Sequence, residues 1–134
     1  SRGLGDVYKR QNYPFVNYLG YLDNDALQQE VGSWTYFLNP VFYYSRGVST
    51  KLAKAFGWGI PVISTTIGCR GYVWQQGNPA LAETPAQMAE AILSLSKNAE
   101  VITKADEEVK ELIASIPDMN VTAKLLSVFI SRIS

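Results

Sequence analysis

Short apolar runs alternate with helical stretches along most of this chain, and this alternation is the strongest constraint on its fold. The runs read as strands at residues 15–19, 34–38 and 60–65. Strands separated by helical stretches pair in one direction, because each helix returns the chain to the same edge of the sheet. The pattern therefore predicts an α/β fold in which a parallel sheet lies between two layers of helices, a three-layer α/β/α arrangement.

Capping residues and prolines set the expected helix boundaries. We predict helices over residues 23–31, 48–58, 85–97, 99–115 and 121–132. The clearest start is Thr84-Pro85-Ala86-Gln87, which combines an N-cap, a proline at the first helical position and a glutamine that completes a capping box. Asp23 or Asn24 is expected to cap the first helix, and Asn120 the last.

Composition excludes several classes of protein. The chain has 134 residues, 47% of them apolar, and a formal net charge of zero, so we predict one domain with no nucleic-acid partner. The absence of histidine removes the commonest metal ligand and the commonest general base. Cys69 is the single cysteine, which fits a reducing cytoplasm as the predicted location. Without a histidine to activate it, Cys69 is expected to fill space rather than act as a nucleophile.

The charges are unevenly distributed along the sequence. No acidic residue lies between Glu30 and Glu83. The basic residues of that stretch are Arg46, Lys51, Lys54 and Arg70. They are interpreted either as a solvated helix face or as part of an anion-binding site.

Geometry favours the anion site. A helix that starts near Val48 and follows a strand begins at the carboxyl edge of the sheet, where parallel sheets bind ligands. Its first backbone N–H groups have no partner within the helix, and its dipole attracts an anion. A diphosphate is the expected ligand, held as well by basic side chains and approached closely at a glycine. The predicted site residues are Arg46, Gly47, Val48, Ser49, Thr50, Lys51 and Lys54.

Two further groups of residues are candidates for the site. Arg70 lies in a glycine-flanked loop, so it either reaches the phosphates or belongs to an ordinary surface loop. The aromatic residues 42–44 precede the site and either line a sugar pocket or pack in the core, and we favour the core.

The run over residues 46–63 resembles the signature of the retaining group 1 glycosyltransferases of the GT-B fold. It has a glycine-bearing helix start and the pattern Ala-x-x-x-Gly-x-Pro-Val from Ala55 to Val62, followed by a strand. The likeness extends over residues 14–97. It implies the second half of a Rossmann-like carboxy-terminal domain that binds the donor in a bacterial enzyme, with Tyr21 and Leu22 on the side of the nucleobase.

The resemblance also implies an activity. Such an enzyme transfers a hexosyl group from a nucleotide-diphosphate sugar to a glycan or another acceptor, as in polysaccharide biosynthesis, without a required cofactor or metal. The family has two glutamates, with seven residues between them, where this chain has Arg46 and Lys54, and no catalytic residue is identified. The alternatives are a glycosyltransferase-like domain that binds without catalysis, or half of a dinucleotide-binding oxidoreductase, although no Gly-x-Gly-x-x-Gly turn is present.

Residues 1–11 differ in character from the rest and resemble the in-frame translation of a transposase adapter used for sequencing libraries. We interpret them as a non-native leader on a metagenomic sequence, the alternative being a natural leader, and residues 12–134 as the partial domain. The resemblance then implies that an amino-terminal acceptor domain precedes this part in the parent enzyme. That domain would supply any peripheral membrane contact, and the fragment alone is expected to be inactive.

Overall fold

The computed structural model describes residues 13–44, 46–73, 79–115 and 119–133. The chain divides into two compact units, Ser1–Ser33 and Trp34–Ser134. The predicted leader at residues 1–11 lies outside the described residues. Among the helices that are described, none has both the length and the apolar character needed to span a lipid bilayer.

The first unit contains one described helix, α2 (Asn24–Val31). The Asp23 carboxylate caps it as predicted, accepting a hydrogen bond of 2.8 Å from the Ala26 N–H. The strand predicted at residues 15–19 is wrong, because that backbone forms no strand and the Phe15 side chain is 84% exposed. A strand needs a neighbour to pair its backbone groups, and the described residues of this unit offer none.

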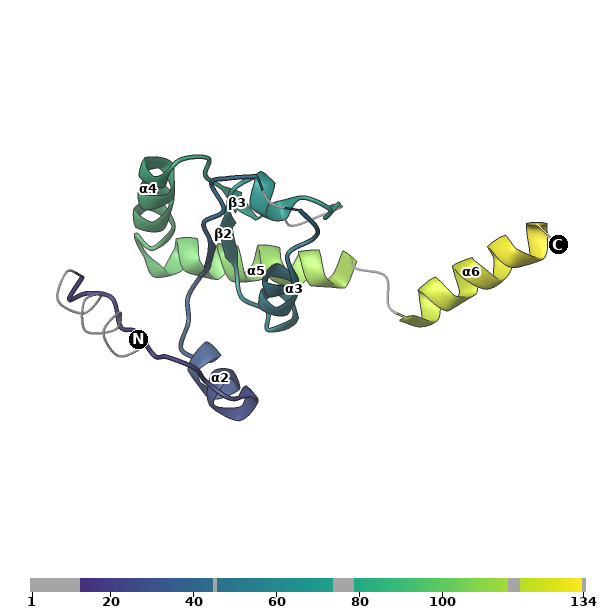
Figure 1. Cartoon of the computed structure of the whole chain (residues 1–134), viewed down its shortest axis with the longest axis horizontal. Coiled ribbons are helices and arrows are strands. Elements are labelled where there is room, and N and C mark those ends of the chain that lie inside the picture. The colour runs from purple at the N-terminus through teal and green to yellow at the C-terminus, as the bar shows by residue number, and fades with distance from the viewer. Residues whose placement is uncertain (1–12, 45, 74–78, 116–118, 134) are drawn as a thin grey trace. The chain divides into compact units, whose positions relative to one another are not determined.

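The second unit is built on a parallel sheet (Figure 1). Its strands are β1 (Phe37–Asn39), β2 (Val62–Ser64) and β3 (Ala80–Leu81), in that order across the sheet. Strand β1 overlaps the end of the strand predicted at residues 34–38 and extends one residue beyond it, and β2 lies within the strand predicted at residues 60–65. Strand β3 was not predicted, because two residues are too few to show an alternating pattern.

Four α-helices of this unit follow the predicted order. They are α3 (Thr50–Gly57), α4 (Pro85–Leu95), α5 (Ala99–Ser115) and α6 (Met119–Ile133). Helix α5 has the predicted bounds, and Thr84 caps α4 as predicted, its Oγ1 accepting from the Gln87 N–H at 3.1 Å. The Gln87 side chain accepts from the Glu83 N–H at 2.8 Å and not from the Thr84 N–H that a capping box requires. The predicted cap at Asn120 is wrong, because α6 begins at Met119 and Asn120 is its second residue.

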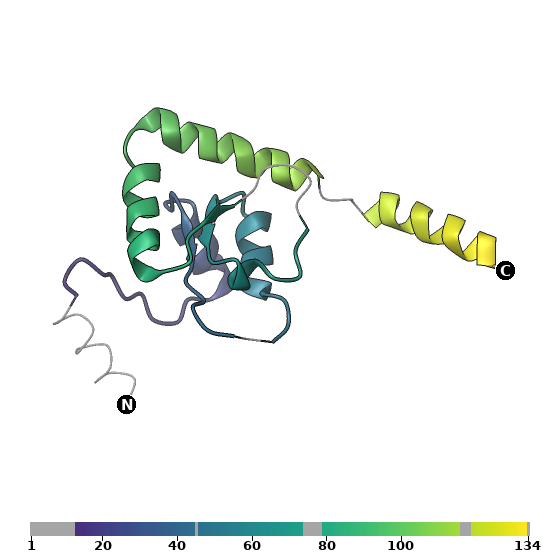
Figure 2. The same ribbon diagram turned by 90° about the horizontal axis from the view of Figure 1, so that it is seen from above.

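Helices cover both faces of the sheet (Figure 2). Neighbouring residues of β2 point to opposite faces, as in any strand. Val62 packs with the buried side chains of α3 and α5, among them Phe56 and Leu112. Ile63 packs on the other face with Met88 of α4. The fold is therefore the predicted three-layer, partial Rossmann-like α/β/α arrangement.

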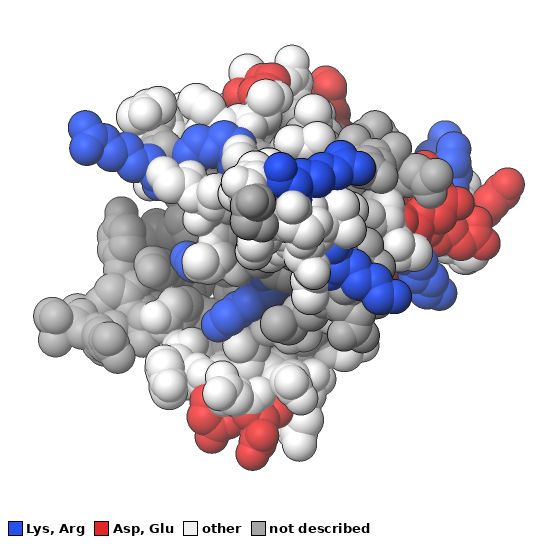
Figure 3. Space-filling model, turned by 90° about the vertical axis from the view of Figure 1, so that its right-hand side faces the viewer, with Lys and Arg blue, Asp and Glu red and all other residues white. Residues whose placement is uncertain are grey.

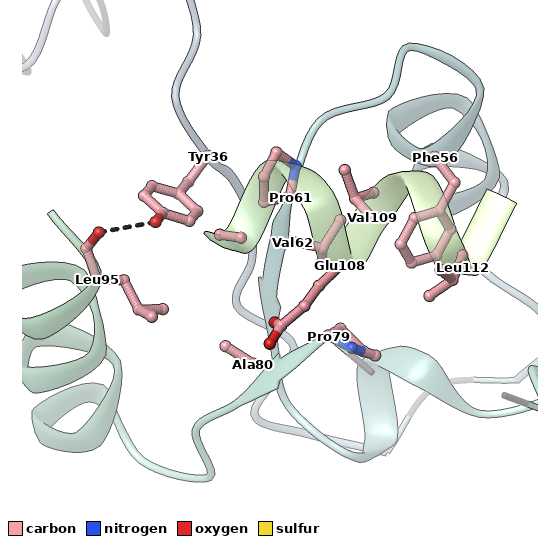
Figure 4. Close-up of a pocket in the computed structure, with 11 residues that line it drawn as sticks. Tyr36, Phe56, Pro61, Val62, Pro79, Ala80, Leu95, Glu108, Val109 and Leu112 are labelled. Atoms are coloured by element: carbon pink, nitrogen blue, oxygen red, sulfur yellow. Dashed lines mark hydrogen bonds between the residues drawn. The ribbon is translucent and has the colours of Figure 1, made fainter. Parts of the chain in front are cut away.

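A small cavity lies at the amino ends of β2 and β3, under α5 (Figure 4). Its volume is ≈ 40 Å³, enough for about one water molecule. Beside it the Tyr36 hydroxyl donates a hydrogen bond of 2.7 Å to the Leu95 carbonyl. Burial raises the pKa of Tyr36, with Asp106 and Glu108 adding to the effect, so the hydroxyl keeps the proton that it donates. The cavity is a packing gap and is too small for a nucleotide.

The core between α3 and α5 sets the stability of the unit. Leu112 is 2% exposed, and Leu112→Ala removes buried methyl groups and leaves a cavity, so we expect a loss of about 2–5 kcal/mol in the free energy of unfolding. Leu93→Ala is the control on α4, because Leu93 is 74% exposed and its loss should change the free energy by less than about 0.5 kcal/mol. Urea unfolding followed by tryptophan fluorescence measures both, and equal effects would contradict the described packing.

Candidate functional site

The carboxyl ends of β1 and β2 are joined by a network of buried hydrogen bonds. Asn39 Nδ2 donates to Ser64 Oγ at 3.0 Å and to the Gly68 carbonyl at 3.2 Å. Gly68 belongs to the 3₁₀ turn Ile67–Cys69, and its N–H donates to Thr65 Oγ1 at 3.0 Å. The Thr65 hydroxyl in turn donates to the Val41 carbonyl. These bonds fix the loops that follow both strands at one edge of the sheet.

Helix α3 begins at the same edge. Ser49 has an extended backbone, with ψ 110°, and its Oγ accepts from the Leu52 N–H at 3.3 Å, so the helix begins at Thr50 and not at the predicted Val48. The Tyr72 hydroxyl donates to the Ser49 carbonyl, and burial raises the pKa of Tyr72, which keeps that hydroxyl protonated. The N–H groups of Thr50 and Lys51 belong to the first helical turn and have no acceptor within the helix.

These elements surround an open cleft of ≈ 270 Å³. Its lining residues are Asn39, Val41, Arg46, Val48, Ser49, Thr50, Lys51, Gly68 and Arg70. Three of them are cations, and no acidic side chain of the described residues lines the cleft. Lys and Arg side chains are spread over the face of the molecule in Figure 3. Three cations near the start of a helix favour an anion in this cleft.

Arg70 braces the loops around the cleft. Its Nη1 donates to the Ile67 carbonyl at 2.9 Å, and its Nη2 donates to the Arg46 carbonyl at 2.8 Å. Its Nε is buried without a hydrogen-bond partner among the described residues. Arg70 therefore holds the backbone at Arg46 in place, and it is one of the residues that line the cleft.

Most of the predicted diphosphate residues come together around this cleft. Those that line it are Arg46, Val48, Ser49, Thr50, Lys51 and Arg70. Gly47 lies among them in sequence with φ 79°, a backbone conformation that glycine adopts readily, but it is not a lining residue. Lys54 is exposed on α3 and does not line the cleft. Tyr21 and Leu22 belong to the first unit, and their predicted role on the side of the nucleobase stays a prediction.

Three lining residues were not predicted. Asn39 ends a strand at the edge where ligands bind, and Gly68 lies in the glycine-flanked loop that holds Arg70, so both had a signal in the sequence. Val41 had none, because it enters the lining through a loop conformation that no local pattern indicates.

The expectations for residues 42–44 and for Cys69 have different outcomes. The core packing favoured for the aromatic residues 42–44 is wrong, since Phe42, Tyr43 and Tyr44 are 42%, 75% and 76% exposed in the loop after β1. Cys69 is buried in the core with α3 and α5, as expected of a space-filling residue, and burial raises the pKa of its thiol. In the part of the chain that the structure describes, no three His, Cys, Asp or Glu side chains are grouped to hold a metal ion.

A parallel sheet with helices on both faces and a cleft at its carboxyl edge is typical of the Rossmann-like class of α/β folds. The sequence model of one family, described as glycosyl transferases group 1, matches residues 4–98, a stretch that contains every lining residue of the cleft. The chain therefore belongs to the group 1 glycosyl transferases. Searches of curated proteins and of solved structures gave no match. The family assigns the chain to sugar transfer and not to the oxidoreductase alternative.

Gly71 provides a test of the packing around the cleft. Its φ is 84°, and an added Cβ would lie 2.5 Å from Val48 Cγ2, so Gly71→Ala should lower the free energy of unfolding by about 1–3 kcal/mol. Gly57→Ala is the control, because Gly57 is helical and an added Cβ meets nothing within 4 Å. That change should leave stability equal or raise it by up to about 1 kcal/mol. Thermal unfolding by circular dichroism compares the two, and a neutral Gly71→Ala would contradict the described contact.

Proposed function

We propose that the cleft at the start of α3 binds the diphosphate of a nucleotide sugar. The observation that carries the proposal is the convergence of Arg46, Lys51 and Arg70 beside the first amides of one helix, with no acidic residue in the lining that the structure describes. Backbone N–H groups and cations together form the usual protein site for phosphate oxygens. A diphosphate matches this arrangement better than a neutral ligand, because a neutral ligand would leave the cations unbalanced.

In this proposal the cleft also assists the chemistry. When the bond between the sugar and the diphosphate breaks, negative charge develops on the leaving diphosphate, and fixed cations and amides stabilise it. The reaction needs no metal, because Arg46, Lys51 and the helix amides supply the positive charge. The sugar passes to a glycan or another acceptor with retention of configuration.

The acceptor side of the reaction belongs to another part of the parent enzyme. We propose that an amino-terminal domain binds the acceptor and provides any peripheral contact with a membrane, and that the 134-residue chain binds the donor without turning it over. The parent is proposed to be a cytoplasmic bacterial hexosyltransferase of polysaccharide biosynthesis. Tyr21 and Leu22 are proposed to contact the nucleobase.

Lys51 provides the direct test of donor binding. Lys51→Ala removes a cation from the cleft, and a charge-assisted contact is worth about 1.5–3 kcal/mol, so the dissociation constant for a nucleoside diphosphate should rise roughly tenfold or more. Lys54→Ala is the matched control, since Lys54 lies on the same helix outside the lining and should leave affinity unchanged. Isothermal titration of the whole chain with UDP, GDP, ADP and NAD⁺ measures this.

Two results of that titration would reject the proposal. The first is that none of the three diphosphates binds, and the second is that Lys51→Ala and Lys54→Ala weaken binding equally. Tighter binding of NAD⁺ than of every nucleoside diphosphate would instead favour the dinucleotide alternative.

The absence of a metal requirement gives a separate prediction. Because side chains and amides balance the diphosphate in this proposal, adding EDTA should change the dissociation constant of the preferred diphosphate by less than about twofold, a small fraction of the binding free energy. The same titration with Mg²⁺ present is the comparison. Binding that disappears in EDTA and returns with Mg²⁺ would show that the cation set of the cleft is not sufficient.

A further inference from the structure

The cleft carries more positive charge than a diphosphate ester requires. Its lining includes Arg46, Lys51 and Arg70, while the diphosphate of a nucleotide sugar carries one negative charge on each phosphate near neutral pH. The first amides of α3 contribute further positive potential. One lining cation is therefore left unbalanced when a donor with a neutral sugar binds, and no acidic lining residue of the described chain compensates for it.

The structure indicates which cation is left over. Lys51 lies in the first turn of α3, next to the amides that would hold the phosphates. Arg70 already donates from both terminal nitrogens to backbone carbonyls. The Arg46 side chain is exposed and has no hydrogen bond to a described residue, while its backbone carbonyl is held by Arg70. Arg46 thus lines the cleft, and no described residue engages the donors of its guanidinium.

Resting on the proposed function, we infer that the donor sugar carries a carboxylate, so that the donor is a nucleoside-diphosphate uronic acid, and that Arg46 pairs with this carboxylate. A guanidinium presents two parallel N–H donors that match the two oxygens of a carboxylate. A neutral sugar has a hydroxymethyl group at that carbon and cannot balance the charge. Arg46 would then determine specificity for the donor rather than affinity for the diphosphate alone.

The same unbalanced cation has a second potential partner. A free nucleoside diphosphate carries additional negative charge on its terminal phosphate, so the cleft could be complementary to the reaction product instead of an acidic donor. The two ligands share their anionic chemistry and differ in where the extra charge lies. The experiment therefore compares donors that differ only in the sugar carboxylate and includes the free diphosphate.

The test is isothermal titration of the whole chain with two matched pairs, UDP-glucuronate against UDP-glucose and GDP-mannuronate against GDP-mannose, with UDP and GDP added. In the pair whose nucleotide binds, the acidic donor should bind roughly tenfold tighter, which corresponds to about 1.4 kcal/mol. Raising the ionic strength should reduce this ratio. Arg46→Gln should abolish the ratio, Arg46→Lys should keep part of it, and the control Lys54→Gln should leave it unchanged.

The outcomes separate this inference from the function on which it rests. If both members of a pair bind equally, or if Arg46→Gln keeps the ratio, the inference is wrong while donor binding stands. If UDP or GDP binds tightest and the donors of its pair do not differ, the extra charge serves the product and the inference is again wrong. If no nucleotide binds, the proposed function fails with it. Circular dichroism of Arg46→Gln verifies folding, which should persist because Arg70 bonds to the backbone of residue 46.

Discussion

The hydrogen bonds of the Asn39 side chain are the contacts on which the rest of the cleft depends. One amide nitrogen donates to Ser64, at the end of the neighbouring strand, and to the carbonyl of Gly68 in the following turn. Because Asn39 is 6% exposed, these bonds form away from water, and losing them would leave buried polar groups without partners. They bring the ends of two strands and the 3₁₀ turn to one edge of the sheet. The loop that carries Arg70, and through it the backbone at Arg46, is positioned from that edge.

The separation of apolar contacts, polar bonds and charges explains why the basic cleft is tolerated. Apolar burial on both faces of β2 fixes the sheet, and polar bonds at the strand ends then fix the loops. The charged side chains lie beyond the strand ends. Lys51, for example, lines the cleft and is exposed, so solvent screens its charge. Mutual repulsion among these cations is therefore modest, while an anion placed between them would be attracted to each. The buried hydrogen-bond network and the exposed charges are thus separate parts of this edge of the sheet.

The layers of the fold could be predicted from sequence, while the strand ends could not. Apolar periods and caps such as Asp23 and Thr84 depend on neighbours a few residues away, so helices α2, α4 and α5 followed from local sequence. The segment at residues 15–19 has the composition of a strand but lacks a partner strand among the described residues, and pairing is a long-range property that composition does not contain. The same limit applies to the site. Charge pattern and helix start indicated Arg46 and Lys51, whereas the place of Val41 in the lining depends on a loop held by Thr65.

Gly68 lies so close to its neighbours that it restricts how this sequence can vary. A Cβ at this position would lie 2.5 Å from Ser64 Oγ and 2.6 Å from Asn39 Nδ2, the two groups that join the strands. Every single-base change of a glycine codon that alters the amino acid introduces a Cβ, so no one-step mutation fits this space without disturbing the network. A replacement therefore requires both Asn39 and Ser64 to move or to change, because the added Cβ would lie closer than 3.0 Å to each of them. The three positions are thus coupled sterically, because a larger residue at position 68 changes what can occupy the other two.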